Sequence, residues 1–122
     1  MTDSKLLDSS TWLGYFHNRT YSETIESEEM LLLSSLSLFE IKKKLIKNKQ
    51  ESNKIIRALE FIKKRSLIID ANSEIAERAV EISINNNLSA VDSLIYSSAV
   101  VNNAILVTLD NDFRNLKGII VL

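Results

Sequence analysis

The stretch MLLLSSL, residues 30–36, is a continuous apolar run of strand length, followed directly by SLFEIKKKLIKN, residues 37–48. Strands of a parallel sheet are buried on both faces, so they appear in a sequence as nearly continuous apolar runs. We therefore expect a buried strand at residues 30–36. We expect a helix at residues 37–48, with Ile41, Leu45 and Ile46 facing the core.

The same order of strand and helix extends in both directions from this stretch. Further strands are expected at residues 5–8, 67–69, 104–108 and 118–122, and further helices at residues 9–16, 52–65, 73–85 and 89–100. Residues 17–29 are polar and acidic and are expected to hold one short helix. Alternating elements of this kind predict an α/β fold of three layers, a mainly parallel central sheet of about five strands with helices on both faces. The length of 122 residues predicts a single domain over residues 1–122.

Composition excludes several classes of protein. Hydrophobic residues make up 45% of the chain and charged residues 25%, as in an ordinary soluble globule. The apolar runs are only a few residues long, whereas a membrane-spanning helix needs about 20. The start MTDSKLLDSS has no basic-then-apolar pattern, so we expect no secretory signal. With no cysteine in the chain, we expect a cytoplasmic location.

The scarce residue types narrow the possible chemistry further. The chain has one histidine, His17, and no cysteine, which excludes zinc fingers and His/Cys catalytic pairs. Its two glycines, Gly14 and Gly118, cannot form the glycine-rich loops that cradle phosphates. A net charge of −1 gives no general attraction to nucleic acid, so such a partner needs a local basic patch. Hydrolytic chemistry would therefore depend on carboxylates.

Acidic residues follow the predicted strands or begin the helices after them. These acids are Asp8, Glu40, Asp92, Asp110 and Asp112. Ligands of open α/β sheets bind outside the carboxyl ends of the strands, which is where these side chains are expected to meet. Converging carboxylates repel one another and stay ionised only beside a cation, and hard oxygen ligands suit Mg²⁺ or Mn²⁺. Such a metal activates water, so the pattern predicts metal-assisted phosphodiester hydrolysis.

Each acid also has a purely structural interpretation. The pairs Ser37-x-x-Glu40 and Ser89-x-x-Asp92 match a capping box, in which the acid binds the backbone amide of the N-cap residue. Asp8 is a suitable N-cap for the following helix, and the last two acids suit a turn. Capping does not, however, require acids from three strand–helix junctions to gather at one edge of the sheet.

Four blocks of the sequence resemble those of the PIN domain family, and more narrowly its VapC-type toxin ribonucleases from prokaryotic toxin–antitoxin pairs. They are LLDSSTWLGYF at 6–16, LSLFEIKKKL at 36–45, LSAVDSLIYSSA at 88–99 and ILVTLDNDF at 105–113. The resemblance implies a Mg²⁺-dependent endoribonuclease, with Mn²⁺ as the other candidate ion. It also implies a homodimer held inactive by a VapB-type antitoxin, with no membrane partner. The segment between Gly14 and Met30 is shorter than in many relatives, so we expect a curtailed early helical hairpin.

Carried over by position, the resemblance assigns catalytic and metal-binding roles to the acids. Asp8, Asp92 and Asp110 are expected to bind the metal directly, and Glu40 through water or by orienting the attacking water. Asp112 is the fifth acid, expected beside the metal or as an occasional ligand. Two hydroxyl groups are expected to hydrogen-bond these carboxylates: those of Ser10 and Thr108.

The dense basic run after Glu40 is the candidate rim for RNA. The side chains of Lys43, Lys44 and Lys47 follow Glu40 at helical spacing, and Arg114 and Lys117 lie close to the last acids; all five are candidates to guide an RNA backbone. The alternative is a solvated helix face with Glu–Lys pairs.

The aromatic residues and the single histidine are assigned mainly structural roles. Two of Trp12, Tyr15 and Phe16 are expected in the core, although aromatics also stack RNA bases. Phe113 is expected to anchor the loop of the last acids in the core, and His17 has no assigned role.

Two other functions are set beside the nuclease. One is a PIN-like module that binds RNA or protein without turnover. The other is a different phosphate-handling α/β enzyme. An aspartyl phosphatase requires D-x-D after its first strand, but position 10 is serine, and a receiver domain requires an acidic pair where the first strand supplies one acid.

Overall fold

The computed structural model describes residues 4–122 and contains a five-stranded, all-parallel sheet in the order β3-β2-β1-β4-β5. Its strands are β1 (Ser4–Leu7), β2 (Leu31–Ser34), β3 (Ser66–Ile69), β4 (Ala104–Thr108) and β5 (Ile119–Val121). Its helices are α1 (Ser9–Asn18), α2 (Ser22–Ile25), α3 (Ser35–Lys47), α4 (Ser52–Arg65), α5 (Ser73–Asn86), α6 (Ala90–Val101) and the 3₁₀ turn η1 (Asn111–Phe113). The predicted parallel α/β architecture is confirmed.

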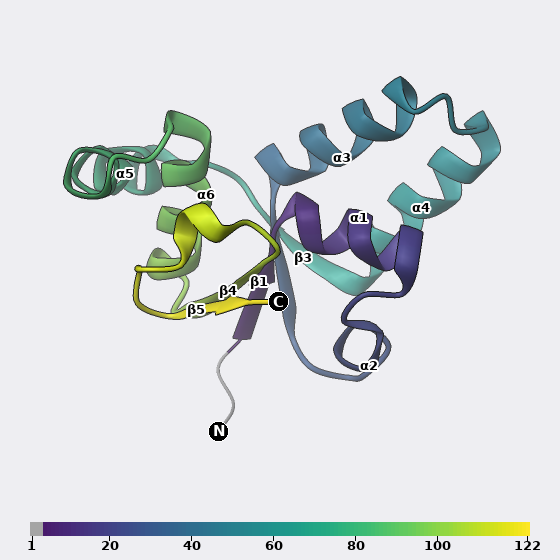
Figure 1. Cartoon of the computed structure of the whole chain (residues 1–122), viewed down its shortest axis with the longest axis horizontal. Coiled ribbons are helices and arrows are strands. Elements are labelled where there is room, and N and C mark those ends of the chain that lie inside the picture. Colours follow the sequence, from purple (N-terminus) through teal and green to yellow (C-terminus); the bar gives the residue numbers. More distant parts are fainter. Residues whose placement is uncertain (1–3) are drawn as a thin grey trace.

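Helices cover both faces of the sheet, giving three layers. α1, α3 and α4 lie on one side, and α5 and α6 lie on the other (Figure 1). Because side chains of a strand alternate between its faces, Leu7 and Val107 point to the first side, where Trp12 is buried. Leu6 and Leu106 point to the second side. Each face of the sheet therefore has its own apolar core.

The aromatic residues contribute to these two cores as predicted. The ring of Trp12 is fully buried, and Tyr15 and Phe16 pack around it with ring centroids 6.0 Å from that of Trp12. Phe113 is 1% exposed and lies in the core on the α6 side, so its prediction as an anchor is confirmed. His17 is exposed at the end of α1.

The start of α3 differs from the prediction. β2 ends at Ser34, whose hydroxyl accepts a hydrogen bond from the amide of Leu36 at 3.2 Å and so caps the helix. The prediction of a strand through residue 36 and a cap at Ser37 is therefore wrong, because the earlier serine takes the N-cap position. Ser37 lies inside the helix and is buried, and Glu40 lies in the second turn instead of the first.

The predicted burial of Ile46 is also wrong. Its side chain is 55% exposed, whereas Ile41 is fully buried and Leu45 packs partly against the core. Successive residues of an α-helix are about 100° apart, so a residue five positions after Ile41 points about 140° away from it. Leu45, four positions on, stays on the buried side.

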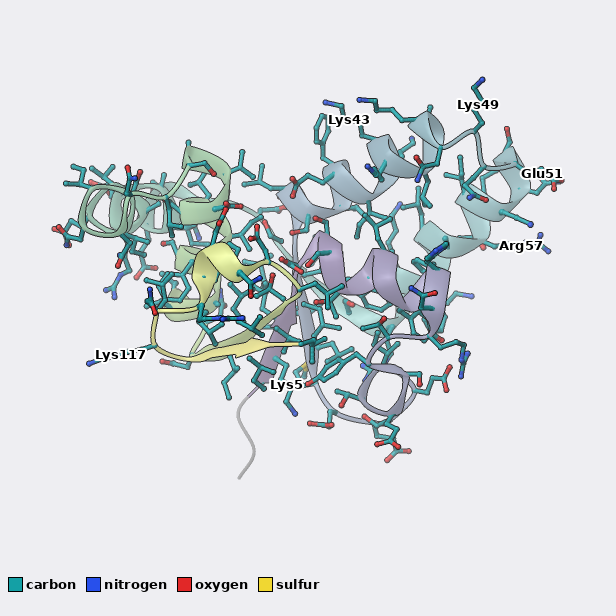
Figure 2. The ribbon with its side chains drawn as sticks, in the orientation of Figure 1. Lys5, Lys43, Lys49, Glu51, Arg57 and Lys117 are labelled. Atoms are coloured by element: carbon teal, nitrogen blue, oxygen red, sulfur yellow. The ribbon has the colours of Figure 1, made fainter. Side chains whose placement is uncertain are left out.

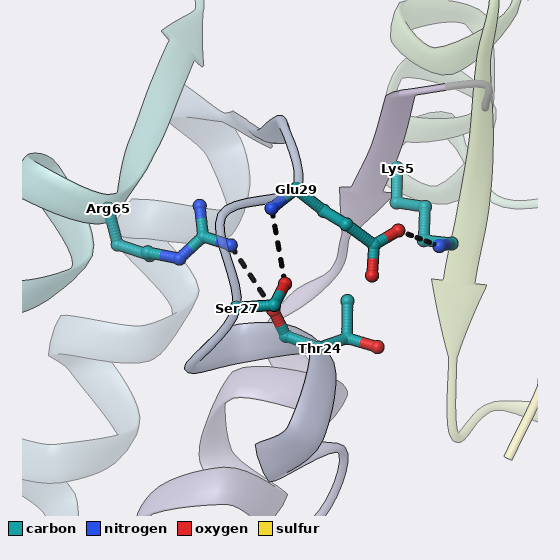
Figure 3. Close-up of polar contacts among 5 residues, drawn as sticks. All are labelled: Lys5, Thr24, Ser27, Glu29 and Arg65. Atoms are coloured by element: carbon teal, nitrogen blue, oxygen red, sulfur yellow. Dashed lines mark hydrogen bonds and ion pairs between the residues drawn. The ribbon is translucent and has the colours of Figure 1, made fainter. Parts of the chain in front are cut away.

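Polar contacts hold the amino-terminal edge of the sheet together (Figure 3). Lys5 of β1 forms an ion pair with Glu29, just before β2. The Glu29 amide donates to the hydroxyl of Ser27 at 3.1 Å, and Arg65 at the end of α4 donates to the Thr24 carbonyl at 3.2 Å. The short α2 is the helix expected within residues 17–29, and these contacts connect its end to α4 and the following segment to β1.

Across residues 4–122, no helix is both long and apolar enough to cross a membrane.

Candidate active site

The predicted acids lie at the carboxyl edge of the sheet, around the adjacent strands β1 and β4. Asp8 directly follows β1, and Asp110 follows β4 by two residues. Asp92 lies in the first turn of α6 and Glu40 in the second turn of α3. Both α3 and α6 run from this edge of the sheet, on opposite sides of it (Figure 1). The acids therefore approach one another from the two outer layers and from the sheet between them.

Asp8 is a buried carboxylate whose oxygens are both hydrogen-bonded. The residue is 5% exposed and is the N-cap of α1. Its Oδ1 accepts from the amide of Thr11 at 3.1 Å and from the hydroxyl of Ser10 at 2.6 Å. Its Oδ2 accepts from the hydroxyl of Thr108 at 2.6 Å. The structural interpretation of Asp8 as a cap is correct, and the same side chain lies at the site.

The hydroxyls of Ser10 and Thr108 connect the end of β1 to the loop after β4. Besides donating to Asp8, the Thr108 hydroxyl accepts from the amide of Asp110 at 2.9 Å. The Ser10 hydroxyl accepts from the amide of Leu109 at 2.9 Å. Each hydroxyl thus uses its donor on a carboxylate and its acceptor on a backbone amide. This arrangement holds the loop of the last acids at a set distance from Asp8.

Three carboxylates converge beside Asp8. Oxygens of Asp92, Asp110 and Asp112 all lie within 4.8 Å of one another. Local hydrogen bonds orient this trio: the hydroxyl of Ser89 caps α6 by accepting from the Asp92 amide at 3.2 Å, and Asp110 Oδ1 accepts from the Asp112 amide at 2.9 Å. Ser89 therefore caps α6 as predicted, Asp110 closes the predicted turn, and the trio's carboxylates are grouped together.

Electrostatic effects couple the trio to the other two acids. Burial raises the pKa of Asp92 above its usual value, and the negative charges of Asp110, Asp112 and Asp8 raise it further, against a hydrogen bond with Ser89. A carboxylate among like charges is harder to ionise, which explains the direction. Asp92 is therefore repelled by the negative charges of three other acids of the cluster.

Glu40 lies outside the trio, but the charges of the other acids act on its carboxyl group as well. Burial raises the pKa of Glu40, as do the charges of Asp92 and Asp8, while a hydrogen bond from Ser9 and the charge of Lys43 act in the opposite direction. The Ser9 hydroxyl lies 3.4 Å from Glu40 Oε1. The five predicted acids thus form one electrostatic unit, with Asp92, Asp110 and Asp112 as its tightest part.

The donor set fits a hard divalent cation. Each member of the trio offers a carboxylate oxygen. Asp8 and Glu40, whose charges act on Asp92 and on each other, carry carboxylate oxygens too. Mg²⁺ and Mn²⁺ prefer such oxygens, and a cation would remove the repulsion that raises the pKa of Asp92. Raised carboxyl pKa values in a polar cluster are characteristic of functional sites.

The lysines of the predicted basic rim lie on two different sides of α3. Lys43, Lys44 and Lys47 are exposed, but Lys44 lines a hollow between α1, α3 and α4, whereas Lys43 and Lys47 line another between α3 and α4. Figure 2 shows Lys43 on α3 and Lys117 well apart from it, in the segment just before β5. Arg114 donates to the side chain of Asn111 at 2.5 Å, next to the trio's loop.

Two hydroxyl residues of the site were not predicted. Thr11 donates its amide and its hydroxyl to Asp8, and Ser9 approaches Glu40 from the first turn of α1. The signal in the sequence is the row of three hydroxyl residues after Asp8, since an N-cap acid is expected to accept from the amide two or three positions on.

Solved structures with similar folds include toxin–antitoxin proteins. A toxin–antitoxin complex from Klebsiella pneumoniae has a TM-score of 0.80 at 22% identity, with 96% of each chain covered. VapBC2 from Rickettsia felis, bound to a DNA fragment of its promoter, has a TM-score of 0.80 at 22% identity, covering 98% of this chain and 97% of that one. VapC20 from Mycobacterium tuberculosis, a sarcin–ricin loop cleaving toxin, has a TM-score of 0.71 at 15% identity, covering 93% and 95%.

Comparison with curated proteins gave no match. At these identities the solved structures establish the fold, which agrees with the parallel sheet and three layers described above. The family model of the PIN domain matches residues 5–119, which takes in all five acids. The chain therefore belongs to the PIN domain family.

Proposed function

We propose that this protein is a metal-dependent endoribonuclease, the toxin of a type II toxin–antitoxin pair. The observation that carries the proposal is the convergence of Asp92, Asp110 and Asp112, whose oxygens lie within 4.8 Å of one another. A grouping of this kind is costly in the metal-free protein, because burial and like charges raise the pKa of Asp92. A site that binds a cation and a phosphate accounts for that cost.

The proposed metal ligands are Asp92, Asp110 and Asp112, with Asp8 next to them. When bound, Mg²⁺ or Mn²⁺ would lower the pKa of a coordinated water and stabilise negative charge on the phosphate. Asp8 is held by four donated hydrogen bonds and so keeps a fixed place beside the trio. The role proposed for Glu40 is to orient the attacking water and to accept its proton, and its raised pKa supports that role.

The reaction that these residues support is hydrolysis of a phosphodiester bond. The oxygen of water attacks phosphorus, the bond from phosphorus to the 3′ oxygen breaks, and the departing 3′ oxygen takes up a proton. The products are a 5′-phosphate and a 3′-hydroxyl. Ser10 and Thr108 bind no substrate in this scheme; they hold Asp8 and the loop of Asp110 in place.

The proposed partner is a VapB-type antitoxin, and the proposed assembly is a homodimer acting in the cytoplasm on RNA. Support comes from the fold, since VapBC2 and the Klebsiella complex contain toxin with antitoxin, and VapC20 is a toxin that cleaves the sarcin–ricin loop. An antitoxin that covers the acids would keep the enzyme inactive.

Cleavage of total RNA by purified, antitoxin-free protein tests the proposal. We expect cleavage with Mg²⁺, none with EDTA, and fragments that carry 5′-phosphate ends, detected by their ligation to an adaptor that requires a 5′-phosphate. The Asp8→Asn protein should be inactive and folded. RNA binding of equal strength in Mg²⁺ and in EDTA, without cleavage, would instead indicate a module that binds without turnover.

A further inference from the structure

The helical hairpin of α3 and α4 carries most of the positive charge of the chain. Residues 35–65 contain ten Lys and Arg residues against three Asp and Glu residues. The rest of the chain contains five Lys and Arg residues against 13 Asp and Glu residues. The positive charge of the chain is therefore concentrated on this hairpin, and it would attract a polyanion there. Figure 2 shows Lys43, Lys49 and Arg57 extending into solvent from it.

A hollow of about 580 Å³ lies between these two helices. Ser35, the first residue of α3, lines one end of it, so the hollow begins at the carboxyl edge of the sheet where the acids lie. Four lysines line it: Lys42, Lys43, Lys47 and Lys63. Among residues 4–122, no Asp or Glu lines this hollow.

Phe39 is the exposed aromatic residue of the hollow. Its side chain is 65% exposed, and the hollow's other apolar residues are Leu38, Ile46 and Leu59. The ammonium group of Lys43 lies 5.8 Å from the centre of the Phe39 ring, which is within cation–π range.

The hollow and the acidic site are next to each other on α3, because a residue of the hollow and an acid of the site are neighbours in the chain. Phe39 directly precedes Glu40, so their side chains leave adjacent positions of the helix about 100° apart. The ammonium group of Lys43 lies over the ring of Phe39, and its charge also acts on the carboxyl of Glu40. A strand of nucleic acid with a phosphate at the acids would have its neighbouring nucleotides within reach of Phe39.

We propose that Phe39 and the lysines around it form a subsite for single-stranded RNA, in which an unpaired base next to the cleaved bond stacks on Phe39. The lysines hold the phosphates on either side of that base. This inference rests on the proposed ribonuclease function and adds to it a residue that determines how the substrate is held. Base stacking on aromatic side chains combined with a basic groove is a common way of binding single-stranded RNA.

An RNA strand fits this hollow better than an acidic protein helix does. A docked helix needs apolar anchors three and four residues apart along an extended apolar groove. Here the hollow is lined by four lysines and four apolar residues, of which Phe39 presents an exposed ring. A flat base between two phosphates matches that arrangement of a ring and separated cations.

Binding of a fluorescein-labelled oligoadenosine of about 12 nucleotides, in EDTA so that no cleavage occurs, tests the subsite. We expect Phe39→Ala to weaken binding about ten-fold, because stacking contributes about 1–3 kcal/mol per base. Phe39→Tyr keeps the ring and should bind within about two-fold of wild type. Ile84→Ala, which removes a 76% exposed side chain of α5 on the other side of the sheet, is the control and should change nothing.

Salt dependence separates the lysines from the ring. The double variant Lys43→Gln/Lys47→Gln should reduce the slope of log affinity against log salt concentration by about 0.7 for each phosphate that the lysines no longer neutralise. Phe39→Ala should leave that slope unchanged, since a stacked base releases no counterions. In cleavage with Mg²⁺, Phe39→Ala should raise KM and leave kcat within about two-fold, because the acids are untouched.

Three results would overturn the subsite. If Phe39→Ala binds and cleaves RNA as wild type does, the subsite is wrong and the ribonuclease proposal stands. If Phe39→Ala weakens the binding of a polyglutamate peptide and not of RNA, the hollow is a protein docking site. If the wild-type protein neither binds nor cleaves RNA, the proposed function fails and the subsite fails with it.

Discussion

Thr108 is the residue on which the geometry of the site depends most directly. Its buried hydroxyl donates to Asp8 and accepts from the Asp110 amide, so one oxygen atom connects two of the acids. Valine has nearly the shape of threonine without the hydroxyl. Replacing Thr108 by valine would leave a buried carboxylate oxygen and a backbone amide without partners, and such groups cost about 1–3 kcal/mol.

We therefore predict that Thr108→Val lowers the free energy of unfolding by about 1–3 kcal/mol and reduces RNA cleavage. Urea unfolding followed by circular dichroism measures the first effect. The matched control is Ser98→Ala: Ser98 is equally buried, but its hydroxyl only adds a bond to the Leu94 carbonyl of its own helix. Equal stability losses in the two variants would show that the Thr108 hydroxyl has no special structural role.

Asp92 makes the metal-free protein sensitive to pH. Burial, with the charges of Asp110 and Asp112, raises the pKa of Asp92 in the folded protein above the value of 3.8 taken for an unperturbed aspartate. Between these two pKa values the folded state binds more protons than the unfolded state, so stability falls as pH rises through that window. Ionisation of Asp92 thus lowers the stability of the metal-free folded protein, and protonation of Asp92 restores it.

We predict that Asp92→Asn stabilises the metal-free protein at neutral pH by about 0.5–2 kcal/mol, the usual range when a single unfavourable feature is relieved. This advantage over wild type should shrink as pH falls through the raised pKa of Asp92. Urea unfolding in EDTA across about pH 4–7.5 measures it. Glu74→Gln is the control, because Glu74 also lies in the first turn of a helix but outside the trio.

The control should lose a little stability at neutral pH, since an acid in a first turn interacts favourably with the helix dipole. A wild-type protein more stable than Asp92→Asn at neutral pH in EDTA would contradict the repulsion inferred for the trio.

At the scale of elements, the pattern of the sequence predicted which helices and strands exist better than where they begin. The apolar run at residues 30–36 predicted β2, but three serines occur within it and just after it, and each is a suitable cap. Ser34 takes that position in the structure, which moves Glu40 from the first turn of α3 to the second. Local propensity could not decide between the serines, because the choice depends on how α3 packs against the sheet.

Arg65 connects α4 to the short helix α2 at the other edge of the sheet. Its Nε donates to the Ile25 carbonyl at 2.6 Å. Its terminal nitrogen donates to the Thr24 carbonyl at 3.2 Å (Figure 3). The Ile25 carbonyl lies at the end of α2, where no later turn of the helix supplies a donor. The Thr24 carbonyl also accepts from the amide and the hydroxyl of Ser27. Contacts of this long-range kind cannot be inferred from residues 17–29 alone.

We predict that Arg65→Met lowers the free energy of unfolding by about 1.5–3 kcal/mol, because hydrogen bonds from a charged donor to a half-buried carbonyl are removed. Arg65→Lys should recover only part of that loss, since one ammonium cannot reproduce the forked geometry. Thermal or urea unfolding measures both. The control Arg57→Met removes an exposed arginine from the same helix and should have little effect, so equal losses at the two positions would contradict this role.

At the scale of the whole molecule, the alternation of elements predicted a parallel sheet, and the fold confirms it. The strand order β3-β2-β1-β4-β5 was not predicted, because crossover connections of similar length permit several orders. That order makes β1 and β4 neighbours, and so brings Asp8 within reach of Thr108 although 100 residues separate them in the chain.

The candidate site was predictable to the same degree. The positions of Asp8, Glu40, Asp92 and Asp110 at the ends of strands and starts of helices predicted that they gather at one edge. The closeness of Asp112 to Asp92 and Asp110 follows from the tight turn of η1 and from the packing of Phe113, which a pattern of residues alone does not specify. The assignment of individual metal ligands stays a prediction.

The measurement that tests the central claim most directly is RNA cleavage by wild type and by Asp92→Asn, each with Mg²⁺ and with EDTA. Asparagine keeps the shape of aspartate, and the cap of α6 is kept because Ser89 bonds the backbone amide of residue 92. We predict cleavage only by wild type with Mg²⁺, with Asp92→Asn at least about 100-fold slower and still folded. Equal cleavage by the two proteins, or cleavage that persists in EDTA, would show that these acids are helix caps and turns without a catalytic metal.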